Sequence, residues 1–143
     1  MQVHQISIFL ENRVGRLEEV TEVLAENEIN IRALSLADTS DFGILRLIVT
    51  KPKEAATILR DRGFTVREND VIAVEVDDHP GGLAHILKLF SSSGISVEYM
   101  YAFVEQHSGN AVMIFRVESV PGAVKALQDA GVSLLSNEQV CSL

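Results

Sequence analysis

Glu11-Asn12-Arg13-Val14-Gly15-Arg16-Leu17 is the first copy of a repeated segment, and a related copy begins 66 residues later, at residue 77. The second copy reads Asp77-Asp78-His79-Pro80-Gly81-Gly82-Leu83. Each copy comes after an apolar, strand-like run and before a helix-like run. A repeat of this length indicates a duplicated structural unit. The apolar pattern also continues downstream, where Leu17, Val20, Leu24, Ile29 and Ile31 recur as Leu83, Ile86, Phe90, Ile95 and Val97.

Hydrophobic periodicity predicts the same order of elements, βαββαβ, in both halves. Right-handed crossovers between the strands then favour an α+β, ferredoxin-like unit with two helices on one face of each sheet. The predicted strands are residues 3–10, 29–37, 44–50 and 64–67, then 71–76, 95–104, 111–117 and 132–135. The predicted helices are residues 14–27, 52–62, 80–93 and 121–130, and turns are predicted at Thr39-Ser40-Asp41 and at Gln106-His107-Ser108-Gly109.

The repeat divides the 143 residues into two domains, residues 1–69 and 70–143. Each is small enough that its core is marginal alone, so the halves are expected to share an interface. If Ile31 and Ala33 face the helices, Leu34 and Leu36 lie on the open face of the sheet. Met100 and Ala102 follow the same pattern in the second half. An apolar open face predicts a homodimer.

The net charge of −8 disfavours binding to nucleic acid and to anionic membranes, both of which need a basic surface. No apolar run reaches the roughly 20 residues of a spanning helix, and the N-terminus lacks a signal-peptide pattern. Cys141 is the only cysteine, so an internal disulfide is excluded. These features favour a cytoplasmic protein.

The two loops and the element order resemble the ACT domain, a regulatory module that binds small metabolites, mostly amino acids. The likeness extends to Asn27-Glu28-Ile29-Asn30-Ile31 and Ser93-Gly94-Ile95-Ser96-Val97, and so covers nearly the whole chain. The resemblance implies two ACT units joined side by side into one eight-stranded sheet with helices on one face. The first half is similar to the serine-sensing domain of phosphoglycerate dehydrogenases, which implies that Asn12 and Asn30 hold an effector. This chain departs from those relatives at Val14, where the family often has proline, and at Leu10, where they have histidine.

The chemistry of the first loop independently favours an amino-acid ligand. A helix that begins near Val14 presents unpaired N–H groups and partial positive charge to a carboxylate. Gly15 lets a ligand approach the backbone, and the Asn12 side chain can serve both ends of a zwitterion. The alternatives are that Asn12 is a plain N-cap and that Gly15 serves close packing. The predicted ligand contacts are Leu10, Glu11, Asn12, Arg13, Val14, Gly15, Arg16, Leu17 and Asn30.

The two loops are predicted to differ in their affinity for an amino acid. The resemblance implies that each loop faces the second strand of the other half. The first loop would then face Tyr99 and Tyr101, although both can equally be ordinary core aromatics. Asp77 and Asp78 repel a carboxylate, so the second loop is the weaker site. That site comprises Asp78, His79, Pro80, Gly81, Gly82, Leu83 and Ser96, whereas Leu10 and the aromatic wall of the first site favour an apolar or aromatic amino acid.

Other chemistry is poorly supported. Asp77, Asp78, His79 and His85 lack the spacing of a metal site, so neither a metal nor a cofactor is expected. No nucleophile–base pair, acid pair or phosphate loop is visible, which argues against an enzyme. Arg46 and Arg116 interrupt strands, either as surface arginines or as carboxylate partners. We therefore expect a non-catalytic amino-acid sensor or, as the alternative, a regulatory subunit that docks on an enzyme of amino-acid metabolism.

Overall fold

The computed structural model describes residues 1–38, 41–103 and 106–143, which form two compact units. One unit comprises His4–Asn69, and the other comprises Met1–Val3 together with Asp70–Leu143. The predicted turn at Thr39 and Ser40, and the predicted strand end at Val104, lie outside the described residues. None of the helices in the described ranges is long and apolar enough to cross a membrane.

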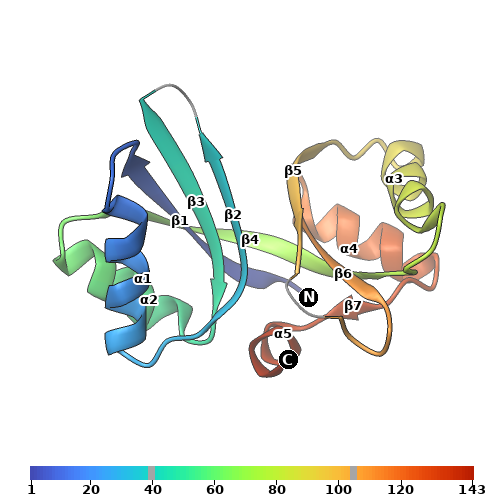
Figure 1. Ribbon diagram of the computed structural model, residues 1–143. Helices are drawn as coiled ribbons and strands as arrows, with labels where there is room; N and C mark the ends of the chain where they lie inside the picture. Colours follow the sequence, from blue (N-terminus) through green and yellow to red (C-terminus); the bar gives the residue numbers. More distant parts are fainter. Residues whose placement is uncertain (39–40, 104–105) are drawn as a thin grey trace. The chain divides into compact units, whose positions relative to one another are not determined.

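The unit of residues 4–69 has an antiparallel sheet with two helices against one face (Figure 1). Along the chain its elements are β1 (Val3–Glu11), α1 (Arg16–Glu26), β2 (Ile31–Asp38), β3 (Phe42–Val49), α2 (Pro52–Asp61) and the first part of β4 (Thr65–Val76). The hydrogen-bonded order is β2-β3-β1-β4. Its core includes alternate residues of β1 and β3 packed against helix residues such as Val20, Leu24 and Leu59.

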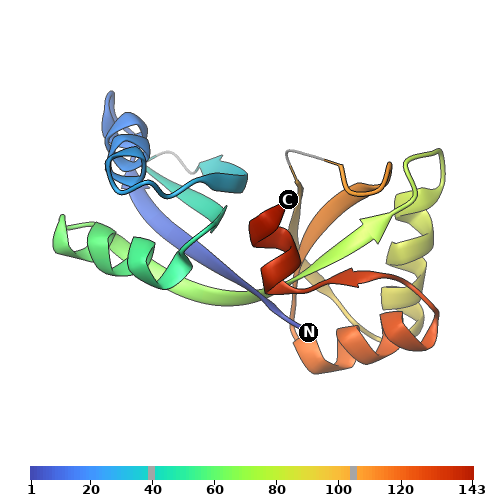
Figure 2. The same ribbon diagram turned by 90° about the horizontal axis from the view of Figure 1, so that it is seen from below.

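The unit of residues 70–143 repeats this plan (Figure 2). The rest of β4 pairs with β6 (Ala111–Val117) and β7 (Leu134–Leu135), and β5 (Val97–Ala102) pairs with the far edge of β6. Helices α3 (Gly82–Ser92) and α4 (Val120–Asp129) pack against a core that includes Ile72, Phe90 and Phe115. A short helix that was not predicted, α5 (Asn137–Ser142), follows β7. The α+β, ferredoxin-like prediction is confirmed for both units.

The described residues form seven strands, whereas eight are predicted from the sequence. The fourth predicted strand of the first half and the first predicted strand of the second half are one strand, β4, of 12 residues. No glycine or proline occurs between Phe64 and Val76, so no residue there breaks an extended chain.

The predicted directions of side chains on β2 and β5 are wrong, because each strand contains a β-bulge. In β2 the register shifts between Ile31 and Ala33, and Leu34 and Leu36 then lie opposite Leu47 and Leu45 of the helix-facing core. The two leucines are therefore on the helix side, 45% and 51% exposed beside the open edge of β2. A bulge changes which face each later residue takes, and an alternation pattern alone does not reveal it.

The second half has its bulge at the equivalent place, between Val97 and Tyr99. Met100 lies opposite Phe115 of the helix-facing core, and Ala102 follows on the same side. Tyr99 and Tyr101 consequently lie on the face away from the helices. The open-face interpretation of Leu34, Leu36, Met100 and Ala102, from which a homodimer was predicted, is thus incorrect, and a homodimer needs another basis.

Candidate functional site

The first loop, residues 11–17, joins β1 to α1 and ends in a left-handed turn. Helix α1 begins at Arg16, two residues later than predicted, with Gly15 as its N-cap at φ 90° and ψ −12°. A Cβ at Gly15 would meet no atom within 4 Å, so close packing does not explain the glycine. The positive φ explains it, because residues with side chains rarely adopt this conformation.

Asn12 does not cap the helix, which removes the alternative considered for it. Its backbone N–H donates to the carbonyl oxygen of Asp41 at 3.1 Å, and this bond ties the loop to the start of β3. The residue is exposed, and no described residue hydrogen-bonds to its side-chain amide. Both the donor and the acceptor of that amide are therefore without a partner among the described residues.

The first turn of α1 offers unpaired backbone donors beside Asn12. The N–H of Arg16 bonds to Arg13 in a tight turn, and the N–H of Glu19 is the first to make the regular helical bond, to Gly15. Between them, the N–H groups of Leu17 and Glu18 have no acceptor in the part of the chain that the structure describes. Such donors, at the positive end of a helix dipole, attract an anion.

Arg16 is engaged within the protein. Its guanidinium lies 4.5 Å from the centre of the Phe64 ring, and its Nη1 donates to Glu19 at 2.7 Å. Its Nη2 also lies 3.9 Å from Glu11, and only 17% of the side chain is exposed. Arg13 in contrast projects into solvent, where it pairs loosely with Glu11 at 3.4 Å. The loop therefore carries one acidic and two basic residues around open donors, a setting that suits a carboxylate.

Asn30, the other asparagine that the resemblance selects, lies at the opposite end of α1 from Asn12. The helix of 11 residues separates them by about 16 Å at 1.5 Å per residue. The backbone of Asn30 is fixed to Thr50 by two hydrogen bonds, and its side chain is exposed just before β2. Within this unit the two asparagines cannot touch one small ligand.

The second loop, residues 77–83, has the same backbone as the first. Gly81 is the N-cap of α3 at φ 92° and ψ −10°, and the N–H groups of His79, Gly82 and His85 repeat the three bonds that Arg13, Arg16 and Glu19 make in the first loop. Its side chains differ, because Asp77 and Asp78 give it two negative charges. Asp78 accepts a hydrogen bond from Gln106 at 2.8 Å.

Among the other residues predicted for the second site, Leu83 packs against the helix-facing core, while Pro80 and Ser96 are exposed. His79 forms a hydrogen bond with the carbonyl oxygen of Pro80, which is the main cause of a raised pKa, and nearby Asp77 raises the pKa further. Below this pKa, His79 partly offsets the loop's negative charge. The structure contains no group of three His, Cys, Asp or Glu side chains suited to a metal within its described ranges.

Tyr101 is 8% exposed and Tyr99 is half-buried, both on the helix-free face of their sheet. The proposed aromatic wall assumed the opposite direction. That these two tyrosines contact a ligand stays a prediction. It was based on side chains that point toward the helices, and the structure shows them on the other face.

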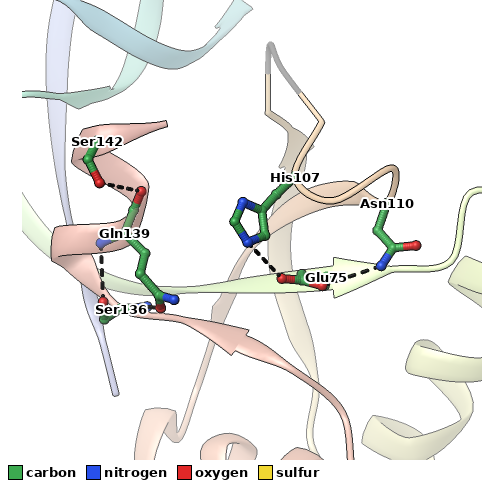
Figure 3. Close-up of polar contacts among 6 residues, drawn as sticks. All are labelled: Glu75, His107, Asn110, Ser136, Gln139 and Ser142. Atoms are coloured by element: carbon green, nitrogen blue, oxygen red, sulfur yellow. Dashed lines mark hydrogen bonds and ion pairs between the residues drawn. The ribbon is translucent and has the colours of Figure 1, made fainter.

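A polar pocket of about 210 Å³ in the unit of residues 70–143 was not predicted from the sequence. It is lined by Asp77, Gly82 and His85 beside the second loop, by the end of α4 and the residues after it (130–133), and by Glu75 and Asn110. Glu75 fixes the turn before β6, because its carboxylate accepts from Asn110 at 3.3 Å and lies 3.4 Å from His107 (Figure 3). The sequence signal for this pocket was Gly82, which stands where the first loop has Arg16.

A family model described as the ACT domain pair matches residues 1–143. The crystal structure of protein BT0572 from Bacteroides thetaiotaomicron is 40% identical, covers 100% of this chain and 98% of its own, and superposes with a TM-score of 0.94. The ligand-free regulatory subunit of aspartate kinase from Thermus thermophilus is 18% identical, with coverage of 89% and 91% and a TM-score of 0.63. The regulatory subunit of aspartate kinase from Thermus flavus is 17% identical, with coverage of 92% and 94% and a TM-score of 0.62. No curated protein matches significantly.

Proposed function

This chain belongs to the ACT domain pair family, and from that premise we propose that it is a non-catalytic regulatory protein whose first loop binds an amino acid. The observation that carries the proposal is that two N–H groups just after Gly15, those of Leu17 and Glu18, have no acceptor among the described residues. The N–H groups of Leu17 and Glu18 would bind the α-carboxylate, and the Asn12 amide would bind the ammonium through its oxygen. Arg13, which lies in the same loop, adds long-range attraction for the carboxylate.

We also propose that the ligand links two copies of the chain. Because Asn12 and Asn30 lie at opposite ends of α1, a ligand that contacts both takes them from different copies. Strand β2 suits such an assembly, since it is an edge strand of its unit and carries exposed Leu34 and Leu36 beside its open edge. Binding would then stabilise the homodimer, as linkage requires of a ligand that prefers one assembly state.

A thermal-shift screen of the twenty amino acids tests the proposal. A ligand that binds only the native state raises the melting temperature by mass action. We expect one amino acid, or a small related group, to do so and also to increase the dimer fraction in sedimentation. The Asn30→Ala variant should lose both effects, because Asn30 closes the site from the second copy. If none of the twenty amino acids shifts the melting temperature, the proposal is refuted.

The alternative is a regulatory subunit that docks on an enzyme of amino-acid metabolism. The same exposed leucines of β2 would then bind a different chain. The two assemblies are distinguished by a Leu34→Asp, Leu36→Asp double variant. If the double variant loses the self-association that the purified wild type shows, the homodimer is favoured. If the wild type is already a monomer and the double variant only stops co-purifying with an enzyme, the alternative is favoured.

A further inference from the structure

The polar pocket beside the second loop lies at a position where the first half of the molecule has a side chain, Arg16. The two halves can be matched by their hydrogen bonds as well as by their sequences. Glu11, Arg16 and Glu19 correspond to Asp77, Gly82 and His85 in the loop and the first helical turn. After the second helix of each half, Phe64 corresponds to Val132, because their N–H groups bond to Leu59 and Leu127 in the same way.

In the first half, the residues at these positions hold a guanidinium group. Arg16 stacks on Phe64 with 4.5 Å between its Cζ and the ring centre, and it lies 2.7 Å from Glu19 and 3.9 Å from Glu11. A cation thus fills the space between the loop, the first helical turn and the segment after the second helix. Two carboxylates and an aromatic face are what a guanidinium prefers.

In the second half the cation is missing. Of its three partners only Glu11 has a counterpart of the same kind, Asp77, because His85 stands in place of Glu19 and Val132 in place of Phe64. Gly82 has no side chain to fill the space, and Asp77 keeps a carboxylate where Glu11 stands. A side chain at residue 82 is also excluded, because a Cβ there would overlap the carbonyl oxygen of Asp77. The chain therefore leaves a pocket of about 210 Å³ at this place.

The first turn of α3 brings partial positive charge to the pocket, and two carboxylates outweigh it in favour of a cation. Asp77 and Glu75 are both among its lining residues, and the C-terminal end of α4, which carries partial negative charge, forms another side. His85 also lines the pocket, and its imidazole offers a ring nitrogen for a hydrogen bond. The volume is below the range of about 300–1,000 Å³ typical of drug-sized ligands, so the group that enters is small.

We propose that this pocket binds the guanidinium or ammonium group of a small organic cation in the position that Arg16 occupies in the first half. The group pairs with Asp77 and enters between the first turn of α3 and residues 130–133. The site is separate from the amino-acid site at the first loop and takes the opposite charge.

Titration of the isotopically labelled protein with methylguanidinium, followed by amide NMR, tests the proposal. We expect saturable shifts at residues 77, 82, 85 and 130–133. Asp77→Asn should weaken binding about fivefold or more, since an ion pair near a surface contributes roughly that factor. Asp78→Asn is the matched control, because it removes a neighbouring charge that does not line the pocket, and its affinity should stay within about twofold of the wild type.

A gain-of-function variant keeps the test decisive. His85→Glu restores the carboxylate that contacts Arg16 in the first half, and we expect it to tighten methylguanidinium binding several-fold. Free L-arginine and an N-acetyl-arginine amide, titrated in parallel, distinguish a metabolite from the arginine of a peptide. The proposal is overturned if no saturable shift occurs at these residues, or if Asp77→Asn and Asp78→Asn weaken binding equally. The Asn12→Ala variant should bind the cation normally, which separates this test from that of the amino-acid site.

Discussion

The two loops have the same backbone and opposite chemistry. Gly15 and Gly81 adopt the same left-handed turn, at φ 90° and φ 92°, and the three backbone hydrogen bonds around each are equivalent. The first loop has one acidic and two basic residues and fills the space behind it with Arg16, whereas the second has two aspartates and leaves that space open. Duplication thus preserved the turn at the start of each helix, while the side chains around it came to differ in charge and in size.

The two loops differ most at residue 82, which is glycine where the first loop has Arg16. Gly82→Ala should destabilise the protein by about 3 kcal/mol, because the new Cβ overlaps the Asp77 carbonyl oxygen and the backbone must move. Arg16→Ala, at the matching position, should cost only about 1 kcal/mol through lost packing on Phe64. Urea unfolding of both variants measures the difference, and equal losses would show that the two helix starts do not differ as described.

The shared left-handed turn predicts equal effects in the two loops. Gly15→Ala and Gly81→Ala should each cost about 1–2 kcal/mol, since both force a side chain into positive φ without any clash. Their free energies of unfolding, measured by the same urea method, should agree. A large inequality would mean that one turn is tied to contacts beyond its backbone conformation.

The ends of the first helices in the two halves also form a matched pair. Glu28 has a positive φ of 55° where the second half has Gly94 at 69°. Glu28→Gly should therefore stabilise the protein by about 0.5–1 kcal/mol, because glycine adopts this conformation without strain. Thermal unfolding checks the prediction, with Glu26→Gly as a control that should destabilise because Glu26 lies within α1.

The smallest expected effect concerns charge and pH. In the second loop, His79 stands where the first has Arg13, and the bond to the Pro80 carbonyl with the nearby Asp77 raises its pKa above 6.5. A raised folded-state pKa gives stability that is present below the unfolded value and lost as pH rises through the folded value. NMR titration should find the raised pKa, and Asp77→Asn should lower it only partly, because the Pro80 bond remains. An unshifted wild-type pKa would contradict this description of the loop.

The sequence predicts the duplicated element order because each half repeats its apolar spacing around a glycine loop. It could not reveal the bulges of β2 and β5, since an extra residue leaves composition unchanged while reversing the direction of Leu34 and Tyr99. The pocket could not be predicted from the sequence for another reason. It arises from the contrast between Arg16 and Gly82, and that contrast has meaning only once Phe64 and Glu19 are known to surround the arginine.

We propose that Asn12 and the N–H groups of Leu17 and Glu18, which have no acceptor among the described residues, make the first loop the amino-acid site. Calorimetric titration of the wild type, Asn12→Ala and Asp78→Ala with the amino acid selected by the thermal screen tests it most directly. Loss of a hydrogen bond to a charged group should weaken binding in Asn12→Ala about tenfold or more, while Asp78→Ala should bind within about twofold of the wild type. Equal weakening in the two variants, or unchanged affinity in Asn12→Ala, would contradict the claim.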